Sequence, residues 1–171
     1  NIKRRVYEAW AAQKRNVLVV SPTGSGKTEI KASIFSDCRR PGVAIAHRQE
    51  LVGQISNAIA RAGVYHRIIG PKAVIAFCIT QHIKLFGKSF HHAQSPMAVA
   101  GIDTLNARAS DLTQWCNQVE IWDIDEAHHV LQENKWGAGV KLFPRAWGVG
   151  FSASPIRCDR RGLGRHAKGV F

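Results

Sequence analysis

The chain has 171 residues, which is enough for one domain with a sizeable core but short for two domains of ordinary size. Hydrophobic residues make up 45% of it and charged residues 21%, a composition that excludes a disordered or low-complexity chain. The 24 Lys and Arg outnumber the 12 Asp and Glu, and the formal charge of +12 favours a polyanionic partner such as nucleic acid. A basic solvated surface is the alternative that charge alone leaves open.

Apolar runs and helical stretches alternate along the chain. In chain order they predict a strand at 17–20, a helix at 27–35, a strand at 43–46, a helix at 49–62, a strand at 67–69, a helix at 74–85, a strand at 97–102, a helix at 104–119, and strands at 119–124 and 147–151. This alternation predicts an α/β fold with a mainly parallel β-sheet and helices on both faces. In such sheets a ligand binds outside the carboxyl ends of the strands, so the chemically active residues should follow the apolar runs.

A phosphate-binding loop (P-loop) follows the first predicted strand. Residues 21–28 read Ser-Pro-Thr-Gly-Ser-Gly-Lys-Thr and open the next helix. The glycines let backbone N–H groups turn toward a phosphate, and the helix N-terminus adds the positive end of its dipole. The lysine would reach the β- and γ-phosphates of ATP, and the threonine after it would ligate Mg²⁺. The predicted nucleotide-binding residues are Thr23, Gly24, Ser25, Gly26, Lys27 and Thr28.

Two adjacent carboxylates follow the strand at 119–124. Asp125 would hold Mg²⁺, directly or through water, and Glu126 would polarise the water that attacks the γ-phosphate. Asp123 is a less favoured metal ligand because it lies inside the strand. The alternative is that the Asp-Glu pair merely begins a turn, but a P-loop NTPase needs a second metal ligand. We therefore predict Lys27, Asp125 and Glu126 as the catalytic residues and Thr28 and Asp125 as the metal ligands.

The cysteines and apolar segments bear on where the protein works. The cysteines form no C-x-x-C pair, are too dispersed for a metal site and are too few for a disulfide scaffold, which predicts free thiols in a reducing cytosol. No run of residues has the length and apolarity of a signal peptide or a membrane span. We expect a cytoplasmic protein with no membrane partner. The four cysteines are Cys38, Cys78, Cys116 and Cys158.

Five segments of the chain resemble, in family order, motifs of superfamily 2 DEAD/DEAH-box helicases. These are residues 21–28 for motif I, 46–51 for motif Ia, 103–105 with Arg108 for the next nucleic-acid contact motif, 125–128 (Asp-Glu-Ala-His) for motif II, and 152–154 for motif III. The closer likeness is to phage and bacterial helicases related to the Res subunit of type III restriction enzymes. The resemblance covers the whole chain and implies that residues 1–171 are the first of two RecA-like P-loop NTPase domains.

The resemblance also implies cofactors, partners and further site residues. A helicase domain of this kind binds ATP and Mg²⁺, acts on nucleic acid, for which we expect DNA rather than RNA, and comes from a bacterium or phage. A second RecA-like domain, absent from this chain, would supply an arginine finger, so the chain alone should hydrolyse ATP slowly. The residues implied in nucleic-acid contact or coupling are Arg48, Thr104, Arg108, His128, Ser152 and Ser154.

Three features of the chain depart from the family pattern or leave it open. Ser21 stands where the generic P-loop has Gly, which we interpret as a helicase subtype. Glu8 stands where the family often has an adenine-reading Gln, so adenine selectivity is not predicted. The basic residues of 157–168 could line a nucleic-acid groove or form a solvated linker.

Two other functions are compatible with these motifs. One is a restriction- or remodelling-type translocase that moves on duplex without unwinding it. The other is a non-hydrolysing module in which ATP only switches affinity for a partner. Glu126 argues against the second alternative, because a switch without hydrolysis does not need a water-orienting acid.

Overall fold

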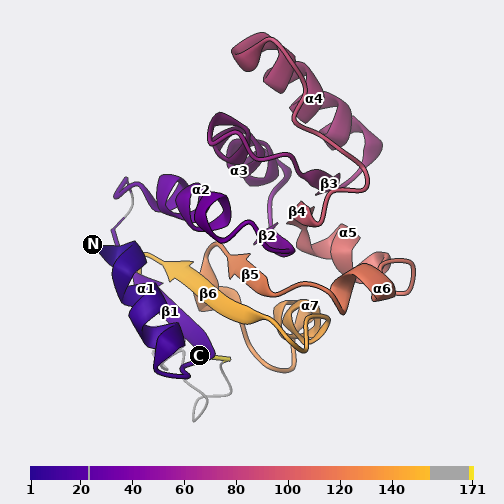
Figure 1. Cartoon of the computed structure of the whole chain (residues 1–171). Helices are drawn as coiled ribbons and strands as arrows, with labels where there is room; N and C mark the ends of the chain where they lie inside the picture. The colour runs from indigo at the N-terminus through magenta and orange to yellow at the C-terminus, as the bar shows by residue number, and fades with distance from the viewer. Residues whose placement is uncertain (23, 155–169) are drawn as a thin grey trace.

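A computed structural model of the chain describes residues 1–22, 24–154 and 170–171 (Figure 1). The described residues form one six-stranded sheet in the order β1-β6-β5-β2-β4-β3, in which every neighbouring pair is parallel. The predicted parallel sheet is therefore confirmed. Its strands are β1 (Asn16–Val20), β2 (Gly42–Ala46), β3 (Arg67–Ile69), β4 (Met97–Gly101), β5 (Ile121–Ile124) and β6 (Trp147–Ser152).

Helices cover both faces of the sheet (Figure 1). Because side chains alternate along a strand, Ile121 and Trp122 of β5 enter separate apolar clusters on opposite faces. Helices α1, α2 and α3 pack on one face, with α4 against α3, and α5, α6 and α7 pack on the other. The helices are α1 (Ile2–Ala11), α2 (Lys27–Cys38), α3 (Gln49–Arg61), α4 (Lys72–Phe86), α5 (Ile102–Ala107), α6 (Thr113–Cys116), α7 (Lys135–Lys141) and the 3₁₀ helix η1 (Ala127–His129).

Two glycines of β6 make room for aromatic rings. A Cβ at Gly148 would collide with the indole of Trp122, and one at Gly150 would collide with the ring of Phe171. The Trp122 and Phe171 rings are themselves in edge contact, with centroids 6.1 Å apart. The two glycines therefore allow β6 to pack closely against the Trp122 and Phe171 rings. Trp122 belongs to β5, the strand that precedes the predicted catalytic pair.

The prediction of a single helix over 104–119 is wrong. Helix α5 ends at Ala107, and in the rest of the predicted range only the four residues of α6 are helical. The Thr113 hydroxyl donates hydrogen bonds to the carbonyls of Ala109 and Ser110 at 3.2 and 2.9 Å. Such bonds from side chain to backbone compete with a continuous helix, and they stabilise the turn that separates α5 from α6.

Helices α1 and α7 were not predicted from the sequence. Asn1 caps α1 by accepting a hydrogen bond from the Lys3 N–H, and Asn134 caps α7 by accepting from Trp136 and Gly137. Helix α7 contains two glycines, which disfavour a helix when tertiary contacts are not considered. The caps were the local signal that could have revealed both helices.

The structure describes three of the four cysteines. Cys38, Cys78 and Cys116 are free thiols, and Cys158 lies outside the described residues. Within the described ranges, no helix is both long enough and apolar enough to span a bilayer.

A buried hydrogen-bond chain ties α3 to α4 and to the segment before β3. Phe90 N–H donates to His82 Nδ1 at 3.3 Å, which leaves the proton of neutral His82 on Nε2, 3.0 Å from Ser56 Oγ. The hydroxyl can then donate to His66 Nε2 at 2.8 Å, while His66 Nδ1 lies 3.0 Å from the Val64 carbonyl oxygen. Every polar atom in this chain has a partner only when both imidazoles are neutral.

Acid should destabilise the fold through this chain of hydrogen bonds. Burial lowers the pKa of His66 from 6.5 to about 4 and also lowers the pKa of His82. Because the unfolded state takes up these protons first, the stabilisation is complete above pH 6.5 and is lost as the pH falls toward 4. For His66 the loss is roughly 3 kcal/mol. Urea denaturation as a function of pH should show this decline, and His66→Gln should flatten it.

The matched control for this prediction is His92→Gln, which removes an exposed imidazole. It should leave the pH dependence of the free energy of unfolding as in the parent. An equally steep decline in the parent and in His66→Gln would show that the buried imidazoles do not control acid stability.

Candidate nucleotide and nucleic-acid site

The strand ends bring the predicted motifs to one edge of the sheet. Val20, the last residue of β1, is paired with Ser152, the last residue of β6. Ile124 at the end of β5 is paired with Ile45 of β2, and Ala46 of β2 with Gly101 at the end of β4. The P-loop, motif III, the Asp-Glu pair, motif Ia and the Thr104 region therefore follow one another along this edge. This order of motifs follows from the order of the strands in the sheet, which the sequence alone does not give.

The P-loop has the open backbone that phosphate binding requires. Gly24 and Gly26 have φ values of 79° and 76°, a left-handed conformation that side chains disfavour. Apart from adjacent residues, a Cβ at either glycine would have no neighbour within 4 Å among the described residues, so the loop is open on this side. The Ser21 hydroxyl donates a hydrogen bond to Ser25 Oγ at 2.6 Å. Ser21, which stands where the generic P-loop has Gly, therefore stabilises the loop.

Lys27 lies over the loop that precedes it. Its Nζ donates hydrogen bonds to the carbonyls of Ser21 at 2.9 Å and Pro22 at 3.3 Å. Both of these contacts are with backbone carbonyl oxygens and neither is with a carboxylate. Thr23, the remaining predicted residue of this loop, lies outside the described residues.

The predicted metal ligands are chemically suited to Mg²⁺. Thr28 is the second residue of α2 and Asp125 directly follows β5, with its N–H donating to the Ile45 carbonyl at 3.2 Å. A hydroxyl and a single carboxylate are hard oxygen donors, and Mg²⁺ is commonly held by one or two carboxylates together with substrate phosphates. Among the described residues, no group of three or more His, Cys, Asp or Glu could hold a metal alone. These residues fit a metal that arrives with a nucleotide.

A buried lysine lies behind Asp125. Lys31 Nζ is 3.1 Å from Asp125 Oδ1 and 3.4 Å from Asp123 Oδ1, and the Lys31 and Asp123 side chains are each 1% exposed. Burial raises the pKa of Asp123 to about 7, against the opposing effect of Lys31. Sequence reasoning did not identify Lys31. An acidic residue inside an otherwise apolar strand was the signal that a buried cation would lie opposite.

Glu126 is linked by side chains to motif III. Its backbone has φ 53° and ψ 49°, a left-handed conformation that is uncommon for Glu. One carboxylate oxygen lies 3.1 Å from His128 Nδ1, which in turn is 3.3 Å from Ser152 Oγ. The Ser152 hydroxyl donates to the Ser154 carbonyl at 2.7 Å, and the Ser152 carbonyl accepts from the Ser21 N–H at 2.9 Å. Motifs I, II and III are therefore joined by a continuous series of short contacts.

Two pockets share His47 and Arg48 of motif Ia. One, of about 480 Å³, is lined by Glu126, His128, His129, His47 and Arg48 among others. Burial is the main cause that lowers the pKa of His47 and of His129, so both imidazoles favour the neutral form.

The second pocket, of about 190 Å³, brings Arg48 and Thr104 together. Arg108 does not line it. Arg108 lies near Arg67, the first residue of β3, where its charge helps to lower the pKa of the Arg67 guanidinium after the larger effect of burial. The structure thus groups two of the three predicted nucleic-acid contacts.

Comparison with protein families identifies the chain. Residues 1–157 match the family described as the type III restriction enzyme Res subunit. The chain belongs to this family. This is the family that the motifs of the chain resemble. Among curated proteins, no significant match to the chain was found.

Solved helicase structures share the fold of this Res-family domain. The bacteriophage T4 UvsW helicase aligns over 88% of this chain and 50% of its own, at 17% identity and a TM-score of 0.61. The Pyrococcus furiosus Hef helicase domain aligns over 88% and 32%, at 21% identity and a TM-score of 0.59. A second T4 UvsW structure aligns over 87% and 28%, at 17% identity and a TM-score of 0.59. The chain thus spans half or less of these structures, and the likeness establishes its RecA-like fold.

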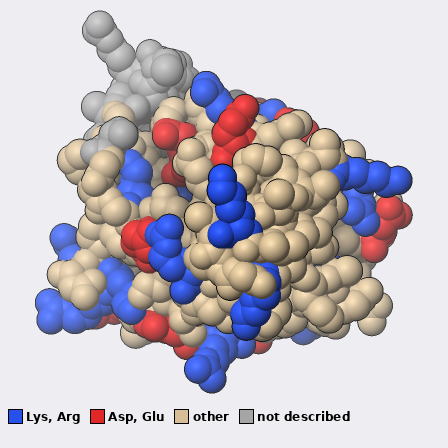
Figure 2. Space-filling view, turned by 90° about the horizontal axis from the view of Figure 1, so that it is seen from above, with Lys and Arg blue, Asp and Glu red and all other residues tan. Residues whose placement is uncertain are grey.

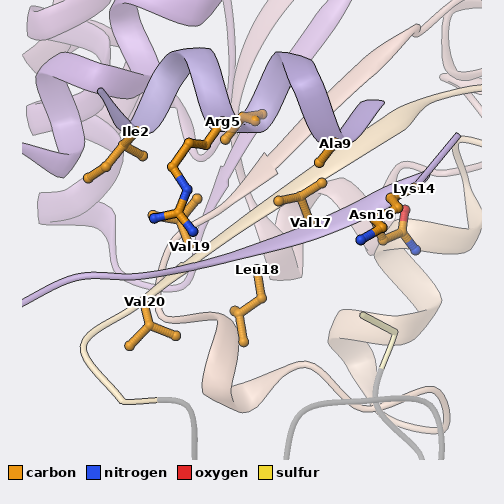
Figure 3. A pocket seen from close by; sticks show the side chains of 10 residues that line it. Ile2, Arg5, Ala9, Lys14, Asn16, Val17, Leu18, Val19 and Val20 are labelled. Atoms are coloured by element: carbon orange, nitrogen blue, oxygen red, sulfur yellow. The ribbon is translucent and has the colours of Figure 1, made fainter. Parts of the chain in front are cut away.

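A further pocket of the Res-family domain lies between α1 and β1 beside the P-loop (Figure 3). It has a volume of about 510 Å³ and includes Arg5, Val19 and Val20 in its lining. Glu8 is not part of the lining. Its carboxylate lies 3.3 Å from Arg4 Nε in an exposed ion pair on α1. The residue at the family's adenine-reading position therefore does not line this pocket.

The basic surface of the domain is dispersed on the face drawn in Figure 2. Lys and Arg side chains are spread over this face, and several have Asp or Glu side chains beside them. Exposed pairs include Arg40 with Glu120 at 2.6 Å and Arg61 with Glu29 at 2.9 Å. The predicted basic tail lies outside the described residues: Arg157, Arg160, Arg161, Arg165 and Lys168.

Proposed function

We propose that the chain is the ATP-binding and hydrolysing half of a nucleic-acid-dependent ATPase that moves along or unwinds DNA. The observation that carries this proposal is the convergence of the P-loop, Ser152 and Glu126 at one edge of the sheet. They are joined by the Ser21 to Ser152 hydrogen bond and by the contacts through His128. This arrangement would connect the nucleotide site to motif III, which could then respond to whether ATP or ADP is bound.

Each residue of the proposed site has a separate task in hydrolysis. Lys27 would exchange the loop carbonyls for the β- and γ-phosphates, and the N–H groups around Gly24 and Gly26 would hold the phosphate oxygens. Thr28 and Asp125 would hold Mg²⁺, which when bound neutralises charge that develops on the phosphates. Glu126 would orient the attacking water and take up its proton. The reaction transfers the γ-phosphoryl group to water.

The contacts of Glu126 suggest how hydrolysis is coupled to nucleic acid. His128 connects the Glu126 carboxylate to Ser152 and Ser154 of motif III. On its other side, Glu126 shares a pocket with Arg48, the proposed contact to the nucleic-acid backbone. A shift of either neighbour would move the catalytic carboxylate, so the state of the strand and the state of ATP would influence each other.

We further propose that the complete motor is cytoplasmic and uses a second RecA-like domain. The first domain contains the P-loop and Asp125 with Glu126, but hydrolysis in related NTPases is accelerated about 10³- to 10⁵-fold by an arginine finger. The 171-residue chain should therefore bind ATP, hydrolyse it slowly and fail to separate duplex strands.

Nucleic-acid binding by the chain should depend strongly on salt. The charge of +12 and the exposed Arg48 predict weak binding through phosphates, with a log-log slope of about −0.7 to −0.9 for each phosphate neutralised. Arg48→Ala should weaken binding to a single-stranded DNA oligonucleotide and reduce the magnitude of that slope by about 0.7. Fluorescence anisotropy at a series of salt concentrations measures both quantities.

Arg61→Ala is the matched control for this experiment. It removes the same charge from the far end of α3, where Arg61 is paired with Glu29. Its slope should stay closer to that of the parent. Equal effects of the two substitutions would indicate general charge attraction and would remove Arg48 from the proposed contact surface.

A further inference from the structure

Lys31 is a buried cation that the proposed roles of the catalytic residues do not use. It lies one turn after Lys27 on α2 and is 1% exposed. None of its contacts within the described part of the chain has hydrogen-bond geometry, although two carboxylates lie within ion-pair distance. Its Nζ also lies over the Phe151 ring, 5.0 Å from the centroid. A buried ammonium is costly unless it is compensated, so these charges must hold it in place.

The two carboxylates around Lys31 differ in their exposure to solvent. Asp123 and Asp125 are two residues apart at the end of β5, so both side chains project from the same face of the sheet. The Asp123 side chain is enclosed at 1% exposure, whereas Asp125 is 15% exposed and lies at the strand end. Asp123 therefore stays beside Lys31 whatever binds at the strand end. Asp125 can share its charge with Lys31 on one side and with a ligand on the other.

We propose that Lys31 and Asp123 form a positioning pair that orients Asp125 toward the divalent cation. This inference rests on the proposed function, because it assigns a support to the same metal ligand. Lys31 Nζ lies 3.1 Å from Asp125 Oδ1, so its charge attracts this oxygen and restrains the side chain. Asp123 keeps Lys31 compensated when the charge of Asp125 is drawn to the cation. Without Asp123, Lys31 would compete with the cation for Asp125, its single remaining counter-charge in this group.

Two variants separate positioning from structural support. Asp123→Asn keeps the size of the side chain and removes its charge. Lys31→Met combined with Asp123→Leu removes both buried charges, and such replacements often preserve or raise stability. Both variants should bind Mn²⁺ in the complex with ADP about tenfold more weakly than the parent, as residues that support metal ligands commonly do when mutated. Affinity for ADP in the presence of EDTA should change by less than about twofold, because the P-loop is untouched.

Mn²⁺ binding is measured by electron paramagnetic resonance, ADP binding by calorimetry and folding by thermal denaturation. The control is Glu29→Gln with Arg61→Met, which removes an exposed ion pair that also involves α2. This control should keep the parent's Mn²⁺ affinity. If Asp123→Asn is too unstable to purify, the double variant at Lys31 and Asp123 supplies the test.

The outcomes distinguish this inference from the proposed function. A parent chain that binds neither ADP nor Mn²⁺ with ADP would overturn the proposed nucleotide site, and the positioning role with it. A parent that binds both, with unchanged Mn²⁺ affinity in the two variants, would overturn the positioning pair alone. Reduced thermal stability with unchanged Mn²⁺ affinity would likewise assign Lys31 and Asp123 a purely structural role.

Discussion

Lys27→Ala is expected to weaken ATP binding by about 100-fold or more, which corresponds to roughly 3 kcal/mol. The ammonium would supply the charge that faces the β- and γ-phosphates, and alanine cannot replace it. The substitution should leave the fold intact, because Lys27 is only partly buried and its two hydrogen bonds go to loop carbonyls. Titration calorimetry measures the affinity, and thermal denaturation checks the fold.

Lys72→Ala is the control, since it removes an equal charge from an exposed position at the start of α4. It should bind ATP like the parent. Unchanged ATP affinity in Lys27→Ala would remove the P-loop from the proposed site.

The strands were predictable because their apolar runs are bounded by residues that end them. The prediction for 67–69 coincides with β3, and those for 17–20 and 43–46 differ from β1 and β2 by one residue. The run at 119–124 was too long. The Glu120 N–H donates to the Pro41 carbonyl at 2.8 Å, outside the β5 ladder, and β5 begins only at Ile121. Apolarity marks burial, but backbone pairing decides where a strand begins.

The short helices after β4 and β5 depend on tertiary contacts that a local pattern does not contain. In α7 a Cβ at Gly137 would collide with the Leu131 carbonyl oxygen, so this glycine permits close packing rather than ending the helix. Its effect depends on where the Leu131 loop lies in space. The same sequence signal can therefore end one helix and allow another to pack.

The candidate site was predictable where a motif is continuous in sequence. The residues of 21–28 and 125–126 each follow a strand, and parallel strands end at the same edge. Lys31 was not predictable in this way, because its role depends on Asp123 across a helix–sheet contact. Likewise, only the fold shows that Arg48 and Thr104 share a pocket that Arg108 does not line.

Glu126→Gln should separate the enzyme from a nucleotide switch. Glutamine keeps the size and hydrogen-bonding reach of the side chain but cannot accept a proton from the attacking water. We expect Mg-ATP binding to persist while turnover falls by about 10² or more. The amide can retain a contact with His128, which lies 3.1 Å from the native carboxylate, so the local structure should survive.

Asp125→Ala provides the contrast, because Asp125 would hold the metal and not the water. It should weaken Mg-ATP binding and hydrolysis together, whereas Glu126→Gln should affect hydrolysis alone. Single-turnover measurements with protein in excess over ATP detect even slow hydrolysis by the 171-residue chain and separate it from product release. If Glu126→Gln hydrolyses ATP at the parent's rate, Glu126 is not the general base. If the parent itself binds ATP without hydrolysing it faster than buffer does, the nucleotide-switch module explains the site better, because binding without turnover is the behaviour that distinguishes a switch from an ATPase.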